Sequence, residues 1–530
     1  MHRAPRILAP LVAAALMATP FPAPLLAQGP APAPAAPAPR FDVVEASIAG
    51  IQRAMRAGTL SCHALVAEYL RRIDAYDHNG PALNALIVVH PRALAIADSL
   101  DAVARGGGAT GALHCIPLIV KDNFDTHDLP TTAGSLSLAG FTPASDATMV
   151  RRLRDAGAIV LAKSNLAEFA FTPYETVSSI LPGYTKNPYA LDRVTAGSSG
   201  GTAAAVAASF GAAGLGTDTG NSIRGPSSHQ ALVGIRSTMG LTSRAGVVPL
   251  SLAADIAGPM ARTVADAVAL FQVVVGADAA DPVTEATRGR TIPRYADALV
   301  RDGLRGARIG VLRQAYERPT TDADVVTVFT TALDDMRRAG ATVTDVRIDS
   351  LDARLRAWTA GCDQFRHDIA QYLAAHPGAP VKSVDDILRS RRFHPTVEKR
   401  LERAAAFTDS PDTAPGCAQR DAFRAWLRAE VTRVMDAQQL DALVYPTWSN
   451  PPRLIGDLTT PHGDNSQLFS PNTGFPAIAV PMGWTRGDRL PAGITFFGRA
   501  WSEPTLIRLA YSYEQATHHR RAPGSTPPLQ

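Results

Sequence analysis

The sequence has little of several residue types whose abundance would identify a class of protein. Four cysteines in 530 residues are too few for a fold built on disulfides, and none of them shows Cys-x-x-Cys spacing. The 13 histidines include no His-Glu-x-x-His motif and no paired Cys/His spacing, so we expect no metal site. The phosphate-binding motif Gly-x-x-x-x-Gly-Lys-Ser/Thr does not occur, and we expect no cofactor.

An excess of charge of one sign is also missing. The 52 basic and 48 acidic side chains leave a net charge of +4, which is too slight to indicate a nucleic-acid partner. After residue 30 no apolar run approaches the roughly 20 residues that span a bilayer, so we expect no membrane partner beyond an export signal. By contrast, 46% of the residues are hydrophobic and 19% are charged, which suits a large buried core.

Lysine is scarce, and this makes each lysine informative. Only five of the basic residues are lysine, and an amine that is buried can lose its proton, whereas an arginine keeps its charge. A lysine in an apolar segment is therefore a candidate base. The five are Lys121, Lys163, Lys186, Lys382 and Lys399.

The amino terminus has the pattern of an exported protein. Residues 1–27 carry two early arginines, a short apolar stretch and a final small residue, which predicts a signal peptide; an uncleaved anchor is the alternative. Residues 28–40 alternate proline with alanine and predict an extended linker. We therefore expect the folded domain to cover residues 41–525 of a periplasmic or secreted protein.

An exported protein could oxidise its cysteines. Cys62 and Cys115 lie in segments that we expect to be buried, so free thiols are favoured over disulfides for the four cysteines. If one pair does form, Cys362 and Cys417 are the first to test.

Helical and strand patterns alternate along the chain from about residue 61. Ser61 can cap a helix that ends near residue 73, and Gly201–Phe210 is alanine-rich enough to be a buried helix. This alternation predicts a single large α/β/α domain with a central mixed sheet covered by helices on both faces. Residues 350–435 are charged and helical and could form a cap over the sheet. Further helices are expected at 90–105, 149–155, 263–275, 322–339 and 504–516, and strands at 116–120, 158–162, 212–216, 308–312, 342–346, 440–445, 477–480 and 493–497.

The segment 196–224 carries the strongest signal in the sequence. It reads AGSSGGTAAAVAASFGAAGLGTDTGNSIR, with two glycine-rich turns that contain serine, joined by a helix and a strand. Glycine lets main-chain N–H groups approach a ligand closely. Residues 197–201 also match the Gly-x-Ser-x-Gly elbow, in which Ser199 would be the nucleophile. That elbow needs an apolar strand before it, whereas residues 186–195 are polar and contain proline.

The segment closely resembles the defining stretch of the amidase signature family of serine hydrolases. Further likenesses keep the order of the family over about residues 45–520. They are IPLIVKDN at 116–123, PTTAGS at 130–135, AKSN at 162–165, GPM at 258–260, NTGFP at 472–476 and YEQAT at 513–517.

The resemblance implies a Ser–cisSer–Lys triad. Ser222 matches the nucleophile, Ser198 the bridging serine and Lys121 the base, and 24 residues separate the two serines as in the family. The resemblance also implies a cis peptide bond before Ser198. A neutral Lys121 would draw a proton from Ser222 through Ser198, and burial among apolar neighbours would lower the pKa of that lysine. Lys163 competes for the role of base, because it also lies in apolar sequence.

The same resemblance assigns supporting roles around the nucleophile. Main-chain N–H groups would form an oxyanion hole, Ser199 would hydrogen-bond to the triad, and Asp218 and Arg224 are expected to form an ion pair that holds the loop. Two residues depart from the family: Asn221 and Ala196 stand where glycine is usual, and the Asn221 side chain could narrow the pocket. The expected oxyanion-hole residues are Thr219, Gly220, Asn221 and Ser222.

Together these residues predict an enzyme that hydrolyses the C–N bond of a small-molecule amide to a carboxylic acid and ammonia or an amine. The alternatives are an esterase or carbamate hydrolase that uses the same serine, and a non-catalytic binding protein on the same fold. The acyl group and the amine stay undetermined, and the sequence leaves both a monomer and a homodimer open.

Overall fold

The computed structural model describes residues 41–357 and 361–530, together with residues 11, 13, 15 and 17. Apart from those four positions, the predicted signal peptide (1–27) and linker (28–40) lie outside the described residues. Residues 42–530 form one compact unit. Among the described residues we find no helix that combines the length and the apolar character needed to cross a bilayer.

An 11-stranded mixed sheet runs through this unit, in the order β1-β3-β2-β6-β8-β7-β12-β13-β11-β9-β10. Strand β2 is parallel to β3 and β6, and β9 is parallel to β10 and β11, while the central strands pair antiparallel. The strands are β1 (Leu86–Val89), β2 (Pro117–Lys121), β3 (Ile159–Ser164), β6 (Ala213–Asp218), β7 (Val233–Arg236), β8 (Ile256–Ala261), β9 (Arg308–Leu312), β10 (Thr342–Val346), β11 (Ala442–Pro446), β12 (Ala477–Thr485) and β13 (Leu490–Phe497).

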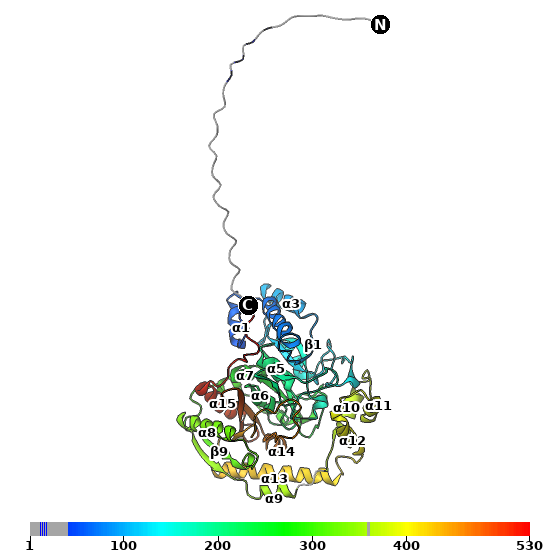
Figure 1. Ribbon diagram of the computed structural model, residues 1–530, viewed down its shortest axis with the longest axis vertical. Helices are drawn as coiled ribbons and strands as arrows, with labels where there is room; N and C mark the ends of the chain where they lie inside the picture. Colours follow the sequence, from blue (N-terminus) through cyan, green and yellow to red (C-terminus); the bar gives the residue numbers. More distant parts are fainter. Residues whose placement is uncertain (1–10, 12, 14, 16, 18–40, 358–360) are drawn as a thin grey trace. The chain divides into compact units, whose positions relative to one another are not determined.

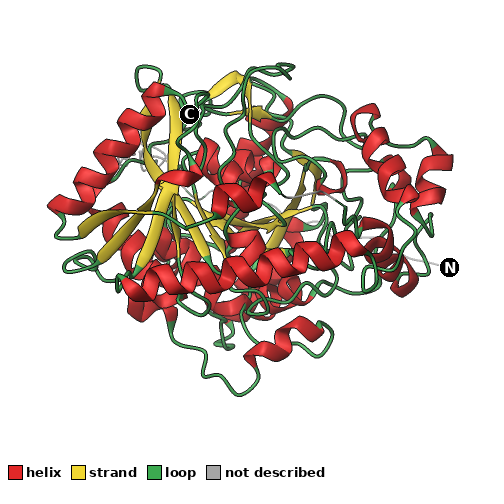
Figure 2. Ribbon diagram, turned by 90° about the horizontal axis from the view of Figure 1, so that it is seen from below, coloured by secondary structure: helices red, strands yellow, loops and turns green. Residues whose placement is uncertain are grey.

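Helices cover the sheet on both faces (Figure 2), which confirms the predicted fold class. They begin as the sequence suggests: the Ser61 side chain accepts a hydrogen bond from Ala64 N and caps α2. Helix α5 is buried at every position, as expected for its alanine-rich composition. The helices are α1 (Ile48–Arg56), α2 (Cys62–Ile73), α3 (Ala93–Arg105), α4 (Thr148–Asp155), α5 (Gly200–Ala207), α6 (Arg224–His229), α7 (Val264–Val274), α8 (Ala323–Arg338), α9 (Leu351–Arg356), α10 (Phe365–Ala375), α11 (Val384–Ser390), α12 (Glu398–Ala406), α13 (Pro415–Ala437), α14 (Ser470–Thr473) and α15 (Glu503–Thr517).

Some strands were not expected from the sequence. Strands β7 and β8 carry glycine and, in β8, Pro259, and such residues weaken a strand pattern. The polar segment before the serine-rich turn forms β4 (Lys186–Asn187) and β5 (Ala190–Val194), a separate two-stranded sheet. It is therefore no central strand of the main sheet, in keeping with the case against a nucleophile elbow.

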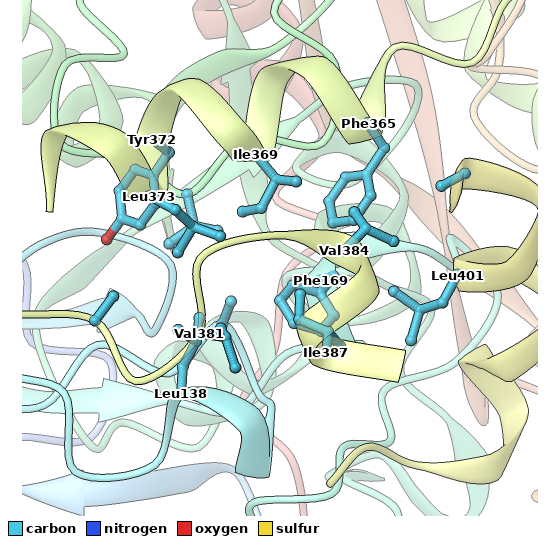
Figure 3. Close-up of a cluster of buried hydrophobic side chains, with 14 of the residues drawn as sticks. Leu138, Phe169, Phe365, Ile369, Tyr372, Leu373, Val381, Val384, Ile387 and Leu401 are labelled. Atoms are coloured by element: carbon cyan, nitrogen blue, oxygen red, sulfur yellow. The ribbon is translucent and has the colours of Figure 1, made fainter. Parts of the chain in front are cut away.

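The predicted cap region is helical and has its own apolar contact with the rest of the unit. In Figure 1, α10, α11 and α12 form a group at one end of α13, and the other end of α13 lies near β9. The Arg308 side chain donates to Gln438 O just after α13, which fixes that end. Figure 3 shows Phe365 and Ile369 of α10 with Ile387 of α11 and Leu401 of α12 around Phe169, all of them buried.

The expectation of free thiols is wrong. Cys62 at the start of α2 is joined to Cys115 just before β2, with Cα atoms 5.5 Å apart, and Cys362 is joined to Cys417 of α13, with Cα atoms 4.6 Å apart. These separations suit a disulfide. More than 50 residues separate the partners of each bridge along the chain, so only the tertiary fold brings them together.

Candidate active site

Two of the predicted triad residues, Lys121 and Ser198, come into contact because β2 and β6 are parallel neighbours. The carboxyl ends of parallel strands lie at the same edge of a sheet, and Lys121 ends β2 while Asp218 ends β6. Helix α5 packs on both strands and precedes β6, so the start of the helix, with Ser198 just before it, lies at that edge as well. The step of 24 residues from Ser198 to Ser222 is thus one helix followed by one returning strand.

Lys121 is fully buried, and within the described residues its amine hydrogen-bonds only to hydroxyl groups. Its Nζ atom lies 2.7 Å from Ser198 Oγ and 2.7 Å from Thr217 Oγ1. Asn123 Nδ2 donates to the same threonine hydroxyl at 3.1 Å. Burial lowers the pKa of Lys121 to about 7, although the charges of Asp255 and Asp218 partly oppose the shift.

Ser198 follows a cis peptide bond from Gly197, as the family resemblance predicts. The glycines around it are required by close packing. A Cβ atom on Gly197 would lie 2.4 Å from Glu175 O, and one on Gly201 would lie 2.3 Å from Asn165 O. Neither glycine has a positive φ, so the glycines of this turn provide space for neighbouring main chain.

Ser222 lines a cavity of about 250 Å³ together with the loop that precedes it. Phe171 and Leu250 form part of an apolar wall of this cavity, and Arg424 of α13 lies on a polar wall. Within the described residues, no hydrogen bond joins the Ser222 and Ser198 hydroxyls, although Ser199 N donates to Ser222 O at 3.3 Å. The nucleophile candidate thus faces open space, and the bridging candidate lies behind it on the lysine.

The loop from Thr219 to Ser222 lines this cavity and carries main-chain donors without a partner among the residues that the structure describes. In the described parts of the chain, the main-chain N–H groups of Gly220, Asn221 and Ser222 donate no hydrogen bond. Asn221 and Ser222 are buried, and buried N–H groups almost always have a partner, so these exceptions beside a cavity mark a place for a ligand oxygen.

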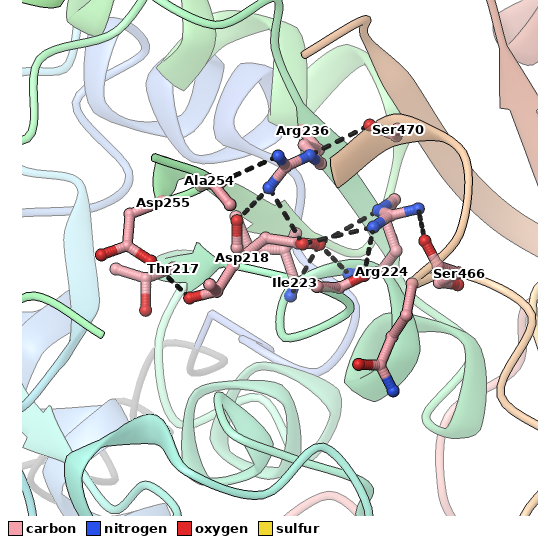
Figure 4. Close-up of polar contacts among 12 residues, drawn as sticks. Thr217, Asp218, Ile223, Arg224, Arg236, Ala254, Asp255, Ser466 and Ser470 are labelled. Carbon is pink, nitrogen blue, oxygen red and sulfur yellow. Dashed lines mark hydrogen bonds and ion pairs between the residues drawn. The ribbon is translucent and has the colours of Figure 1, made fainter. Parts of the chain in front are cut away.

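A buried ionic cluster holds this loop from behind (Figure 4). Arg224 Nε lies 3.0 Å from Asp218 Oδ2, and Arg236 Nη1 lies 3.1 Å from Asp218 Oδ1. Arg224 Nη2 also donates to Gly220 O at 2.8 Å, and Arg236 donates to Asp218 O. Because C=O and N–H point in opposite directions in a trans peptide, the two arginines turn the N–H groups of Asn221 and Thr219 the other way. Burial alone would raise the pKa of Asp218, but Arg224 and Arg236 outweigh it and keep the pKa below the usual value.

Ser199 has a different environment from Ser198. Its hydroxyl accepts from Thr217 N at 3.3 Å and donates to Thr217 O at 3.2 Å, and the residue is fully buried. In the described structure it does not line the cavity. This arrangement suits a hydroxyl that fastens α5 to β6 better than the nucleophile of an elbow.

Lys163, the competing base, is committed elsewhere. Its Nζ atom lies 3.1 Å from Asp122 Oδ1 and donates to Phe124 O, Pro130 O and Thr131 Oγ1 at 2.8–3.0 Å. Burial lowers the pKa of Lys163 as well, but the Asp122 carboxylate opposes the shift, and this set of acceptors suits a structural cross-link. Of the two buried lysines, Lys121 alone has the uncharged contacts that a base requires.

The two departures from the family take different forms. Asn221 keeps a negative φ, and its buried side chain packs on Gly225, where a Cβ atom would lie 2.2 Å from the amide. Both polar atoms of that amide lack a hydrogen-bond partner within the described residues. Ala196 has a φ of 60°, which explains why glycine is usual at this position.

Several residues of the site carry no sequence signal of their own. Thr217, whose hydroxyl accepts a hydrogen bond from the Lys121 amine, lies inside a strand. Arg236 lies in β7, a strand that the sequence did not predict. Asp255 accepts from the Thr219 hydroxyl at 2.5 Å. Each of them reaches the site only through the sheet order.

One cluster elsewhere has the donor types of a metal site. His127, Asp128 and Asp146 place ligand atoms within 4.8 Å of one another. Arg154 already pairs with Asp128 at 2.6 Å and with Asp146 at 3.2 Å, so both carboxylates have a cationic partner. This cluster is an ion-pair network separate from the Ser222 cavity.

Known proteins resemble this chain over most of its length. The family model described as Amidase matches residues 64–507. A probable amidase of Arabidopsis thaliana is 33% identical, covering 91% of this chain and 92% of its own, and a subunit of the glutamyl-tRNA(Gln) amidotransferase of Myxococcus xanthus is 35% identical, covering 87% and 95%. The solved structure of the peptide amidase from Stenotrophomonas maltophilia has a TM-score of 0.82 and 38% identity, covering 91% of this chain and 99% of that one.

The two buried lysines give a stability prediction. Lys163→Met leaves the Asp122 carboxylate buried without a cation and should lower the free energy of unfolding by about 3–5 kcal/mol. Lys121→Met removes an amine that contacts only hydroxyls and should cost about 1–2 kcal/mol. Urea unfolding at about pH 8 measures both, with the exposed Lys399→Met as the control. Equal losses of unfolding free energy in the Lys121→Met and Lys163→Met variants would contradict the difference between the two lysine environments.

Proposed function

Since this chain belongs to the amidase signature family and is a serine hydrolase that acts on carbon–nitrogen bonds, we propose that it works through an acyl-enzyme on Ser222. The observation that carries the proposal is the buried Lys121 amine, 2.7 Å from Ser198 Oγ, behind a cavity lined by Ser222. A lysine of this kind can serve as a base at neutral pH, and no histidine is needed.

The proton moves along the serines. The lone pair of neutral Lys121 accepts the Ser198 proton as Ser198 accepts the proton of Ser222, and the Ser222 oxygen attacks the amide carbon. A rotation of the Ser222 side chain closes the contact with Ser198 once substrate fills the cavity, since catalytic hydrogen bonds often tighten only in the complex. The protonated lysine then returns its proton along the same path to the leaving nitrogen. In deacylation, a water molecule gives its proton through Ser198 to Lys121 and attacks the ester, and the lysine returns that proton along the same path to the leaving Ser222 oxygen.

The negative charge of the tetrahedral intermediate needs donors that are already in place. We assign them to the main-chain N–H groups of Thr219, Gly220, Asn221 and Ser222. Arg224 and Arg236 act as positioning residues, because they fix the carbonyls of Gly220 and Asp218. An oxyanion donor of this type is worth about 3 kcal/mol of transition-state stabilisation.

We propose a primary amide with a peptide or acyl group as the substrate. The likeness to a peptide amidase at 38% identity supports this choice, and the cavity is large enough for an acyl group next to the serine. The same serine could cleave an ester or a carbamate, because an oxyanion hole does not select the leaving group.

We also propose that the protein is exported to the periplasm or secreted. The pattern of residues 1–27 supports this, as does the pairing of all four cysteines in two disulfides, which persist in oxidising compartments. Amino-terminal sequencing of the mature protein from the native host should show removal of about the first 27 residues. Protein that is recovered from the soluble cell fraction with Met1 still present and with free thiols would contradict export.

The nucleophile can be identified with a covalent probe. A fluorophosphonate should label the purified protein, because it phosphorylates an activated serine hydroxyl. Ser222→Ala should abolish labelling. Ser199→Ala is the matched control and should retain it, since the Ser199 hydroxyl is bonded to the main chain of Thr217. Mass spectrometry of the labelled peptide measures the site.

The same experiment separates the enzyme from the binding-protein alternative. Folded wild-type protein that neither takes up the probe nor cleaves any amide would favour the non-catalytic fold. Labelling that survives in Ser222→Ala would instead move the nucleophile to another serine.

The lysine base predicts how the rate depends on pH. Only the neutral amine accepts a proton, and the pKa of Lys121 is about 7, so kcat/KM should rise about tenfold per pH unit below 7 and level off above it. Lys121→Met should lose on the order of 10²–10⁴ of the rate. Initial rates on one amide in buffers of constant ionic strength measure the profile. A rate that is constant from about pH 5 to pH 9 would exclude Lys121 as the base.

A further inference from the structure

The Ser222 cavity has a neighbour. A second cavity of about 450 Å³ shares Arg420, Arg424 and Pro471 with the first, so the two adjoin along α13. Arg428 lines only the second cavity. These three arginines are spaced four residues apart and therefore lie on one face of the helix.

Arg420 is already neutralised. Its Nε and Nη2 atoms lie 2.8 and 3.1 Å from the carboxylate of Asp421, and Nη1 donates to Gln364 Oε1 and to the sulfur of Cys362. The Cys362–Cys417 disulfide holds that sulfur beside the cavity. The guanidinium of Arg420 is thus held by protein groups and forms part of the cavity wall.

Arg424 lacks such a partner. The closest carboxylate oxygen, on Asp421, is 3.8 Å from Nη1, which donates to Ala253 O, and Nε reaches Asn472 Oδ1 at 3.5 Å. In the described parts of the chain, Nη2 makes no hydrogen bond, and the side chain is 13% exposed. A mostly buried guanidinium whose Nη2 atom is accessible and has no hydrogen bond favours an anion.

Electrostatics favours the same ligand. Burial lowers the pKa of Arg424 to about 10, and the neighbouring charge of Arg420 contributes to the same shift. An incoming carboxylate would offset that loss of solvation, and the planar guanidinium matches its two oxygens. Phe171 and Leu250 of the same cavity would contact the alkyl part of the ligand.

We propose that Arg424 binds a carboxylate on the acyl part of the substrate, so that the enzyme prefers amides of acidic acyl groups. This inference rests on the proposed amidase function, since Arg424 and Ser222 line one cavity. When the leaving group is ammonia, the acyl part alone fills that cavity. Arg424 is then a specificity residue that takes no part in the proton relay.

The test compares acidic with neutral substrates of similar size. The α-amides of N-acetyl-aspartate and N-acetyl-glutamate are paired with those of N-acetyl-leucine and N-acetyl-norleucine. We expect wild-type kcat/KM to be at least about tenfold higher for the acidic members, as a charge-assisted hydrogen bond provides. Arg424→Gln should bring the ratio of kcat/KM for acidic over neutral amides close to one, while the neutral amides keep their rates within a few-fold. Arg428→Gln, on the same face of α13, is the matched control and should keep the ratio.

The possible results distinguish a failure of this inference from a failure of the proposed amidase function. An acidic preference that is absent in wild-type protein, or unchanged in Arg424→Gln, overturns the inference while amide hydrolysis itself stands. Failure of wild-type protein to cleave any of the four amides overturns the proposed function. Should Arg424→Gln not fold, Arg424→Lys keeps the charge without the planar pair of donors, and we expect it to lower the ratio several-fold. An unchanged ratio in that variant would also contradict the assignment.

Discussion

The proposed chemistry depends on a lysine that is buried and has no carboxylate partner among the described residues. Lys121 is fully enclosed, and its amine meets two hydroxyls, whereas Lys163, on the neighbouring strand β3, meets Asp122 and several further oxygens. The same residue type is thus the proposed base in one place and a structural cross-link in the other. Burial lowers the pKa of both lysines, but only Lys121 has uncharged hydrogen-bond partners, and this arrangement makes a serine nucleophile without histidine feasible.

The rest of the site keeps this arrangement in place. The parallel pairing of β2 with β6 sets the lysine beside Thr217, and the return of the chain through α5 brings Ser198 to the same edge. On the far side, Arg224 and Arg236 share the Asp218 carboxylate and bond to the carbonyls of Gly220 and Asp218, which fixes the main-chain orientation of the loop. A buried ionic cluster adds little net stability, but it specifies one geometry, and here that geometry is the proposed oxyanion hole.

The sequence predicted the fold class and most helices and strands, because apolar periodicity and caps such as Ser61 are local properties. The position of Lys121 and the serines also followed from the sequence, through the family resemblance. Arg236 and Asp255 could not be predicted, since each reaches the loop through a neighbouring strand or turn whose place depends on sheet order. The prediction of free thiols was wrong for the same reason. Cys62 and Cys115 are buried as expected, but which cysteines lie close enough to pair is a property of the tertiary fold.

The most direct test is to titrate the Lys121 amine itself. With only five lysines in the chain, protein labelled with ¹³C at lysine Cε gives few enough signals to follow by NMR, and the signal lost in Lys121→Met identifies the one of interest. We expect this signal to shift with a midpoint near pH 7, well below the value of about 10.4 that is ordinary for a lysine side chain in water. A Lys121 signal that stays in its protonated position up to about pH 9 would contradict the account.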